Sequence, residues 1–234
     1  MSDRIGVVSF PGSNGDTDAL HALTGAVGVP ARMVDHRETD LSGVAAVVVP
    51  GGFSYGDHLR CGAIARFAPV MAPLRAFAER GGPVLGICNG FQVLTEAHLL
   101  PGALLRNRTL RFHCFWTHVR FDGAPTAWTG QVADGAVLRL PVAHGEGAYY
   151  ADDATLDRLE ATGRVVARYC DAGGDPVGVA NPNGSARGIA AIANAAGNVV
   201  GIMPHPERAS DALIGGDDGL RLLRAALEFV NVPV

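Results

Sequence analysis

Short apolar runs that alternate with helical stretches constrain the fold of this chain more than any other feature. The runs RIGVVSF, from residue 4, and VAAVVVPGG, from residue 44, have the length of strands, and the second begins with six consecutive apolar residues. Such a continuous run is typical of a strand that is covered on both faces of a parallel sheet. The alternation predicts an α/β fold of three layers, with a mostly parallel central sheet and helices on both faces.

The first hundred residues carry this alternation most clearly. Asn14 and Asp16 are expected to cap a first helix that extends from Thr17 to about Val27. The other elements expected here are a strand over 31–36, a helix within 67–82, a strand over 83–87 and a helix over 89–100.

The middle of the chain predicts mixed or antiparallel strands. The stretches 111–121 and 136–150 are rich in β-branched and aromatic residues, and Pro141 and two glycines are expected to break the second. Residues 188–207 contain two apolar runs on either side of a turn with Gly197 and Asn198, which predicts a hairpin.

A last helix is expected from about Asp218 to Val230. Its apolar residues at helical spacing predict one face packed on the sheet, formed by Leu220, Leu223, Leu227 and Val230. No internal repeat, low-complexity segment or linker is evident, so residues 1–234 are predicted to form a single domain.

Composition and charge exclude several classes of function. The 19 basic and 23 acidic residues give a formal net charge of −4, which predicts no attraction to nucleic acid or to anionic membranes. The start MSDRIGVVSF resembles neither a signal peptide nor a membrane span, so we expect a cytoplasmic protein. The four cysteines are widely spaced, without a zinc-ligand pattern, and disulfides are not expected in a reducing compartment.

Cys88 lies in the stretch GICNG, directly after a predicted strand and before a predicted helix. The flanking glycines, Gly86 and Gly90, have the form of a nucleophile elbow, a sharp turn that holds a nucleophile above a sheet. The helix N-terminus also favours the thiolate over the thiol. The alternative interpretation is a small residue that fills a tight turn.

A base for this cysteine is available in the stretch GIMPHPERA. Prolines on both sides of His205 stiffen the segment and bias it away from a helix, so the side chains of His205 and Glu207 are expected to point the same way. Glu207 would then orient the imidazole and stabilise its charged form, as the third member of a triad does. The alternative is a proline-rich surface loop with an incidental histidine.

Four segments in order, PGGFSYGD, GICNGFQ, PVAHGEG and MPHPERA, resemble the class I (triad) glutamine amidotransferases, whose fold is flavodoxin-like. The resemblance extends from residue 11 to the final helix. The stretch GGFSYGDHLRCGAIARFA is similar to members that supply ammonia for purine biosynthesis. The region from about Thr155 to Asn183 matches least, and we expect only a connecting segment there.

The resemblance implies a role for each matching residue. Cys88 would be the nucleophile that attacks the side-chain amide of glutamine, His205 the general base and acid, and Glu207 the residue that orients His205. Further implied roles belong to the backbone N–H groups of Gly52 and Asn89, as an oxyanion hole, and to Gln92, His144 and Glu146, as substrate-binding residues. His144 and Glu146 could also suggest a metal site, but without further ligands none is predicted.

The resemblance also implies partners. Ammonia would pass to a larger ATP-dependent synthetase subunit, with a small bridging subunit in the same complex. This chain has no phosphate-cradling motif, so ATP and magnesium are expected on the synthetase and no cofactor on this chain. The cluster Arg106, Arg108 and Arg111 is a candidate docking surface or, equally, a solvated loop. Cys61 has no evident base and is interpreted as packing.

Three alternatives remain open. A cysteine hydrolase of the α/β-hydrolase type would share the elbow, but its acid usually precedes its histidine, whereas Glu207 follows His205. A non-catalytic stress or chaperone protein with a reactive cysteine would lack the His-Pro-Glu segment. A glutaminase subunit of another amidotransferase is the more serious alternative.

Overall fold

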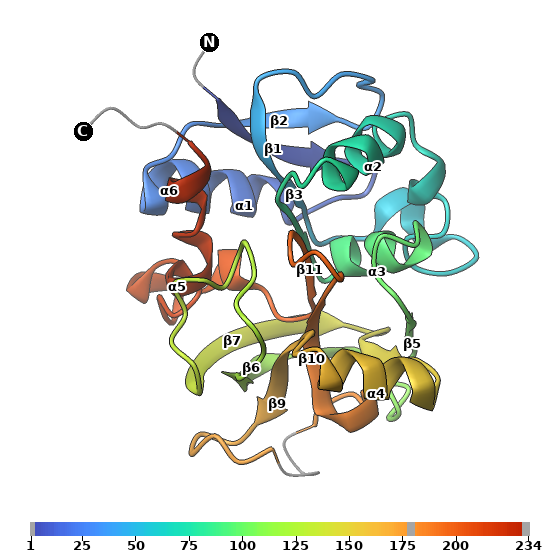
Figure 1. Cartoon of the computed structure of the whole chain (residues 1–234), viewed down its shortest axis with the longest axis vertical. Coiled ribbons are helices and arrows are strands. Elements are labelled where there is room, and N and C mark those ends of the chain that lie inside the picture. Colours follow the sequence, from blue (N-terminus) through green and yellow to red (C-terminus); the bar gives the residue numbers. More distant parts are fainter. Residues whose placement is uncertain (1–2, 177–180, 231–234) are drawn as a thin grey trace.

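The computed structural model describes residues 3–176 and 181–230 and confirms the α/β fold class. In these residues nine strands form one sheet in the order β2-β1-β3-β4-β11-β10-β9-β6-β7 (Figure 1). Their bounds in that order are β2 (Ala31–Asp35), β1 (Arg4–Ser9), β3 (Val44–Val49), β4 (Val84–Ile87), β11 (Val199–Ile202), β10 (Ile189–Ala193), β9 (Val165–Cys170), β6 (His113–Phe121) and β7 (Ala136–His144). Two short strands, β5 (Ala103–Leu105) and β8 (Ala148–Tyr150), pair separately.

The sheet has a parallel and an antiparallel half. The strands from β2 to β11 pair in parallel, and those from β11 to β7 pair in antiparallel fashion. Parallel neighbours need a crossover connection, and these connections contain helices except between β2 and β3, where residues 36–43 form a loop; hairpins suffice for the antiparallel half. The mixed or antiparallel strands expected in the middle of the chain and the hairpin over 188–207 are therefore confirmed.

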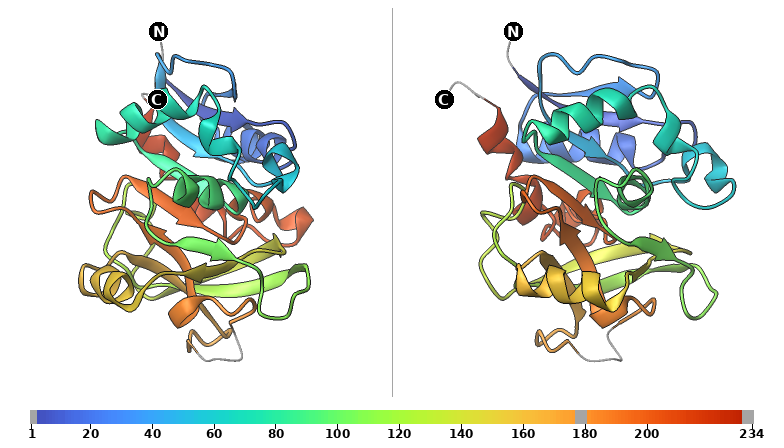
Figure 2. Two further views of the ribbon diagram at one scale, coloured as in Figure 1. Left: turned by 90° about the vertical axis from the view of Figure 1, so that its right-hand side faces the viewer. Right: turned by 45° about the vertical axis from the view of Figure 1, so that its right-hand side comes forward.

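Helices cover both faces of the sheet. Figure 1 places α1, α5 and α6 on one side of the parallel half and α2 and α3 on the other, and Figure 2 shows α4 lying on the antiparallel half. The bounds are α1 (Asp16–His21), which continues as a π-helical segment (Ala22–Val27), α2 (Met71–Glu79), α3 (Asn89–Glu96), α4 (Asp153–Ala161), α5 (Leu220–Leu223) and α6 (Ala226–Phe229). Strands β3, β4 and β11 are buried on both faces, as the continuous apolar run of β3 predicts, whereas the edge strand β2 is mostly only partly buried.

The expected capping of the first helix is wrong. Gly15 occupies the N-cap without a side-chain bond, and Asp16 already lies inside the helix. The Asp16 carboxylate instead accepts a hydrogen bond of 2.6 Å from Ser9 Oγ at the end of β1, and Asn14 Oδ1 accepts one from Arg208. Asn14 therefore serves a contact between segments. Asp16 binds both Ser9 of β1 and, through Oδ1, the N–H of Thr17 in its own helix at 2.9 Å.

The expected single last helix is also wrong. Two short helices, α5 and α6, replace it, and Leu227 is 42% exposed while Leu222 is fully buried. The stretch LRLLRAALEF carries apolar residues around much of its circumference, so periodicity alone does not choose the buried face.

Pro141 does not break the strand in which it lies. Strand β7 continues through Pro141, which is paired with Trp116 of β6. Strand β7 is the outermost strand and has no neighbour on one side. Proline lacks an N–H group, and such a residue is tolerated in an edge strand because no hydrogen bond to a further strand is lost. The carbonyl of Pro141 accepts a hydrogen bond of 2.8 Å from the N–H of His205, so this edge connects to a candidate site residue.

The segment from Thr155 to Asn183 is more than a connection. It contributes most of α4 and all of β9, a strand in the interior of the sheet. Asp152 caps α4 by accepting a hydrogen bond of 2.7 Å from Thr155 N. Across the described ranges, 3–176 and 181–230, no helix has the length and apolar character needed to cross a membrane.

Candidate active site

Cys88 lies at the sharp turn between β4 and α3. Its backbone has φ 50° and ψ −105°, a strained conformation for a residue with a side chain, and only about 4% of the residue is exposed. Two glycines make room for the turn. A Cβ on Gly90 would lie 1.9 Å from the carbonyl oxygen of Val49, and one on Gly86 would lie 2.8 Å from the backbone of Gly90. The predicted elbow therefore forms as the sequence indicates.

His205 and Glu207 form a buried pair beside this turn. His205 Nδ1 lies 2.6 Å from Glu207 Oε1, and each residue is about 2% exposed. The side chains meet although the segment is not extended, because Pro206 opens a single 3₁₀ turn (Pro206–Arg208). The predicted pairing holds, but a turn rather than strand-like alternation produces it.

The charge state of His205 depends on both neighbours. Burial alone would lower the pKa of His205, but the Glu207 carboxylate and the Cys88 sulfur outweigh burial and raise that pKa to about 10. His205 Nε2 is buried without a hydrogen-bond partner among the described residues, and Cys88 Sγ instead points to the carbonyl oxygen of Ala143 at 3.6 Å.

Gly51 sets the close approach of these two side chains. A Cβ at Gly51 would lie 2.7 Å from His205 Cε1 and 3.6 Å from Cys88 Cβ. A side chain at this position would therefore occupy the space between the cysteine and the histidine. The neighbouring Gly52 has φ +141°, and a Cβ there would lie 2.7 Å from Asn14 N, so this position also requires glycine.

The loop that carries Gly52 is held in place by backbone bonds to residues 12–15. Phe53 N donates to Gly12 O at 2.9 Å, and Asn14 N donates to Gly51 O at 3.3 Å. Asn89, on the other side of the cysteine, is the first residue of α3, where backbone N–H groups have no partner within the helix. The two positions expected to form an oxyanion hole thus flank the cysteine turn.

The side chain of Asn89 connects this loop to the helix. Asn89 Oδ1 accepts a hydrogen bond of 3.1 Å from the buried N–H of Ser54, and its Nδ2 lies 3.2 Å from Asp57 Oδ1 and 2.8 Å from Gln92 Oε1. Gln92 Nε2 in turn donates to the carbonyl oxygen of Glu146 at 2.6 Å. Asn89 and Gln92 therefore clamp two loops around the cysteine.

His144 lies in a buried network of hydrogen bonds with two asparagines. Its Nδ1 is 3.1 Å from Asn107 Oδ1 and its Nε2 is 3.5 Å from Asn183 Nδ2, and both asparagines are fully buried. Burial, together with the nearby His113 and His205, lowers the pKa of His144 to about 3, so the ring is neutral at ordinary pH. In the part of the chain that the structure describes, no three His, Cys, Asp or Glu side chains gather as metal ligands would.

Cys61 differs from Cys88 in its surroundings. Burial, followed by a hydrogen bond from the thiol to Asp57, raises the pKa of Cys61, so this cysteine stays a thiol. Asp57 is itself half-buried near Glu146, and its pKa is raised, first by burial. These contacts agree with the interpretation of Cys61 as a packing residue rather than a nucleophile.

The arginine cluster lies at the mouth of the site. Arg106, Arg108 and Arg111 are all exposed, and Arg106 Nε is 3.6 Å from Glu146 Oε1. Two exposed rings stack next to them, with the centroids of Phe53 and Phe112 at 6.4 Å. This rim therefore combines positive charge with exposed apolar surface.

Some residues of the site could not be found from the sequence. Asn107 stands between two arginines in an apparent charged loop, and Asn183 lies 39 residues from His144. The partners of the Asn89 side chain are equally distant, since Ser54 lies 35 residues away. In the sequence each of these residues is only a polar residue near a recognisable motif. That position does not indicate which distant residue it contacts in the folded protein.

The Asn89 clamp gives a testable prediction. Asn89→Ala leaves the buried Ser54 N–H without its acceptor, so the free energy of unfolding should fall by about 1–3 kcal/mol. Because the loop with Gly52 loses its attachment beside Cys88, kcat for glutamine hydrolysis should fall about 10²-fold.

Asn198→Ala is a matched control. Asn198 is similarly buried and donates to the carbonyl oxygens of Ala78 and Gly82, both at 2.8 Å, at the far end of the sheet. This variant should lose comparable stability and keep its kcat, measured by denaturant unfolding and glutamate release. Equal kcat losses in the two variants would contradict the clamp.

The fold and the geometry of the site are typical of α/β enzymes that use a cysteine for acyl transfer. Within that class, residues 2–215 match the model of the CobB/CobQ-like glutamine amidotransferase domain. The chain belongs to this family of glutamine amidotransferases.

Individual proteins of similar sequence indicate a more specific type of amidotransferase. The chain is 59% identical over 224 residues to phosphoribosylformylglycinamidine synthase subunit PurQ of Thermomicrobium roseum, covering 96% of this chain and 95% of the relative. It is 60% identical over 229 residues to the subunit of the same name from Rubrobacter xylanophilus, covering 98% and 100%.

Two solved structures resemble this chain in fold, and one of them is also similar in sequence. A chain in the structure of PurLQS from Thermotoga maritima has a TM-score of 0.85 and 40% identity, with 98% of this chain and 99% of that chain covered. A putative GMP synthase subunit from Thermoplasma acidophilum has a TM-score of 0.62 over 97% and 96% of the two chains, but only 15% identity. The second likeness shows the fold alone.

Proposed function

We propose that this chain is the glutaminase subunit of a phosphoribosylformylglycinamidine synthase, an enzyme of de novo purine biosynthesis. It hydrolyses glutamine to glutamate and ammonia. The observation that carries the proposal is the buried arrangement of Cys88, His205 and Glu207 in a chain about 60% identical, over nearly its whole length, to subunits of that name.

The reaction would begin at Cys88. The Cys88 thiolate attacks the carbon of the glutamine side-chain amide, and the carbonyl π electrons move to the oxygen. That oxyanion would accept hydrogen bonds from the backbone N–H groups of Gly52 and Asn89, which lie on either side of the turn. Donors of this kind, fixed before the reaction, stabilise the developing charge without having to reorganise.

His205 would move the protons. With its pKa raised to about 10, His205 carries a proton at neutral pH and can give it from Nε2 to the departing ammonia. The C–N bond breaks and a glutamyl thioester remains on Cys88. The neutral imidazole then takes a proton from water, which attacks the thioester and releases glutamate. Glu207 holds Nδ1 throughout and stabilises the charged ring.

Gln92, His144 and Glu146 are proposed to shape the glutamine site. Gln92 and Glu146 are joined by a hydrogen bond of 2.6 Å, from Gln92 Nε2 to the Glu146 carbonyl, and the Glu146 side chain lies at the mouth. Both ring nitrogens of His144 have partners, so we assign its contribution to the positioning of the 144–147 loop.

Ammonia is used elsewhere in the proposed complex. That complex contains an ATP-dependent synthetase subunit, PurL, and a small subunit, PurS, as the name PurLQS of the Thermotoga maritima relative indicates. ATP and magnesium belong to the synthetase in this proposal. The exposed arginines and the stacked Phe53 and Phe112 at the mouth support docking of the synthetase on this face.

Two further parts of the proposal concern the whole protein. We assign residues 1–234 to one glutaminase domain, supported by a single sheet that joins the parallel and antiparallel halves. We also assign the protein to the cytoplasm, because the proposed pathway uses soluble metabolites. A role in another amidotransferase is less well supported, since the GMP synthase subunit shares only 15% identity.

Co-purification tests the proposal. The tagged chain, expressed in its native cells, should retain an ATP-dependent synthetase together with a small subunit, and the complex should convert formylglycinamide ribonucleotide to its amidine with glutamine as nitrogen donor. The chain alone should release glutamate only weakly. A complex that aminates a different acceptor would refute the assignment, while leaving the glutaminase chemistry intact.

A further inference from the structure

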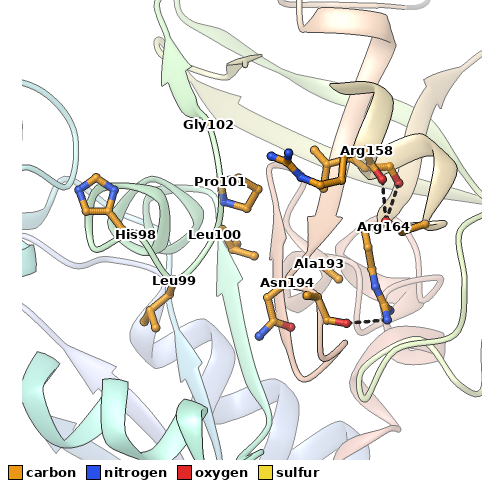
Figure 3. Close-up of a pocket in the computed structure, with 12 residues that line it drawn as sticks. His98, Leu99, Leu100, Pro101, Gly102, Arg158, Arg164, Ala193 and Asn194 are labelled. Atoms are coloured by element: carbon orange, nitrogen blue, oxygen red, sulfur yellow. Dashed lines mark hydrogen bonds between the residues drawn. The ribbon is translucent and has the colours of Figure 1, made fainter. Parts of the chain in front are cut away.

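A pocket of about 550 Å³ lies away from the candidate active site, between the end of α3, helix α4 and the β10–β11 turn (Figure 3). Cys88 stands at the start of α3, whereas the pocket begins after its end, at His98. Eight helical residues separate the two by about 12 Å along the axis. The volume lies within the range of small-molecule sites, about 300–1,000 Å³.

The base of this pocket is apolar. Leu100, Leu159 and Ala193 line it, and each is at most 5% exposed. Two arginines line the pocket from different elements, Arg158 on α4 and Arg164 in the loop before β9, and Figure 3 shows their side chains pointing in different directions, that of Arg164 toward the carbonyl oxygen of Ala195. The described residues that line the pocket include no acidic side chain. The result is a positively charged rim above an apolar floor.

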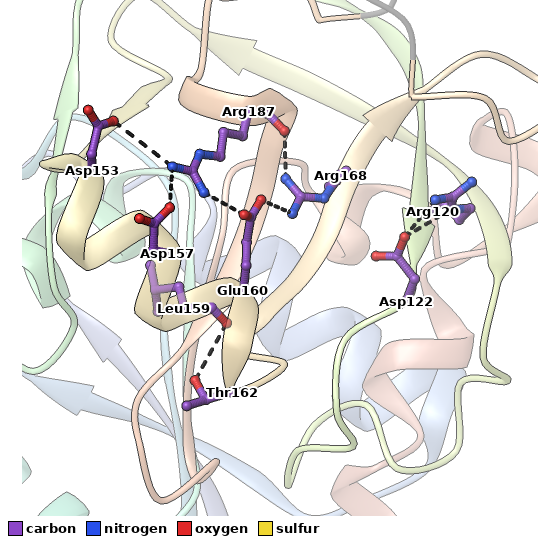
Figure 4. A network of polar contacts seen from close by, with 9 residues as sticks. All are labelled: Arg120, Asp122, Asp153, Asp157, Leu159, Glu160, Thr162, Arg168 and Arg187. Carbon is purple, nitrogen blue, oxygen red and sulfur yellow. Dashed lines mark hydrogen bonds and ion pairs between the residues drawn. The ribbon is translucent and has the colours of Figure 1, made fainter.

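Helix α4 carries its carboxylates on one face and Arg158 on the face that lines the pocket. Its carboxylates at Asp153, Asp157 and Glu160 all lie within 4.0 Å of Arg187, as Figure 4 shows. Glu160 also pairs with Arg168 at 2.7 Å. The three carboxylates on this face of α4 are therefore paired with two arginines from neighbouring segments, Arg187 and Arg168. Arg158 is on the pocket side and takes no part in this network.

The hydrogen bonds of the two pocket arginines go only to neutral groups among the described residues. Arg158 donates to Thr155 Oγ1 at 3.0 Å, and Arg164 donates to the carbonyl oxygen of Ala195 at 2.8 Å. The pKa of the exposed Asp152 carboxylate is lowered first by hydrogen bonds from Thr155 and also by the charge of Arg158, which lies close enough to contribute. Within residues 3–176 and 181–230 no Asp or Glu oxygen lies within 4.0 Å of either guanidinium, and most of their N–H donors stay unused. Arg164 is half-buried, so its charge is only partly screened by water.

We propose that this pocket binds a small organic anion. The phosphate or carboxylate of the ligand pairs with Arg158, the positive charge of Arg164 strengthens the attraction, and the apolar part of the ligand packs on Leu100 and Leu159. A planar guanidinium group can donate to two oxygens of a carboxylate or a phosphate at once, and these charge-assisted hydrogen bonds are the stronger ones. Burial of the apolar part distinguishes this ligand from an inorganic ion, which would gain nothing from the floor.

The pocket is also built from the segments that carry the candidate catalytic residues. The wall from His98 to Gly102 continues α3, which begins beside Cys88. The wall from Ala193 to Ala195 leads through β11 to His205. A bound ligand therefore contacts the far ends of both segments, at a site that glutamine itself does not occupy.

Titration of the full-length chain tests the binding site. The probes are phenyl phosphate and benzoate, which carry both features, inorganic phosphate, which has only the charge, and benzyl alcohol, which has only the apolar part. Calorimetry should show the tighter of the two organic anions binding at least tenfold more tightly than inorganic phosphate and benzyl alcohol. Amide resonances of residues 99–102 and 193–195 should shift on binding.

Two variants and one control locate the binding. Arg158→Gln should raise Kd about tenfold or more and Arg164→Gln should raise it by a smaller factor, whereas Arg221→Ala, at an exposed arginine on α5 without a carboxylate partner in the described structure, should leave Kd unchanged. Arg158 is exposed, so its variant should fold normally even if Arg164→Gln does not. Failure of both organic anions to bind, or binding that survives Arg158→Gln unchanged, overturns the proposal. Glutamine hydrolysis plays no part in these readouts.

Discussion

Cys88→Ala is expected to abolish glutamine hydrolysis, with kcat reduced by about 10⁴-fold or more. The reason is that the chemistry then lacks the atom that forms the thioester, and the oxyanion donors and substrate contacts alone recover only part of the rate. The fold should survive, because alanine fits the volume of the buried cysteine. Glutamate release by the complex with its synthetase, followed under saturating glutamine, measures the effect.

Cys61→Ala is the appropriate control for this prediction. Cys61 is also a thiol near the mouth of the site, but burial and Asp57 raise its pKa and keep it protonated. Its replacement should leave kcat within a few fold of the unmodified protein. Hydrolysis that persists in Cys88→Ala and disappears in Cys61→Ala would show that Cys88 is not the nucleophile.

Glu207→Gln is expected to reduce kcat by about 10²–10⁴-fold and to change its pH dependence. The amide can still accept a hydrogen bond from His205 Nδ1, but it no longer offsets the cost of a buried imidazolium. The pKa of His205, raised to about 10 in the native protein, should therefore fall. The alkaline limb of the pH–rate profile, which reports loss of this proton, should move to lower pH.

The same shift has a consequence for stability. Because the pKa of His205 is raised in the folded state, the stability from its charged form is complete below the unfolded value of about 6.5 and is lost as pH rises through about 10. The difference in unfolding free energy between the native protein and Glu207→Gln should therefore shrink over this range. Glu79→Gln, an exposed carboxylate on α2, should change neither profile. An alkaline limb that stays in place in Glu207→Gln would contradict the role of this carboxylate.

The parts of the site that could be predicted from the sequence are local in the chain. The elbow needs only a strand, two glycines and a helix start within a few residues, and the glycine requirement is fixed by contacts as close as 1.9 Å. His205 and Glu207 are two residues apart, so their pairing follows from a short turn. Such features leave a signature because all their determinants lie in one stretch.

What could not be predicted depends on contacts between distant segments. The side chain of Asn89 reaches Ser54 and Asp57 on another loop, and nothing in GICNG distinguishes that role from a backbone role alone. Helix α4 escapes prediction for a different reason, because its cap at Asp152 and its buried Leu156 and Leu159 are ordinary signals in a region without a recognisable motif. The division of the last helix follows from an apolar pattern that fits more than one buried face.

The covalent intermediate provides the most direct test of the central claim. The complex is mixed with glutamine, quenched in acid within milliseconds and digested, and the peptide that contains Cys88 is examined by mass spectrometry. The account predicts a glutamyl group on Cys88 that appears before free glutamate and accumulates further in variants with slow hydrolysis. Glutamate formation without any adduct on Cys88, or an adduct on a different residue, would contradict it.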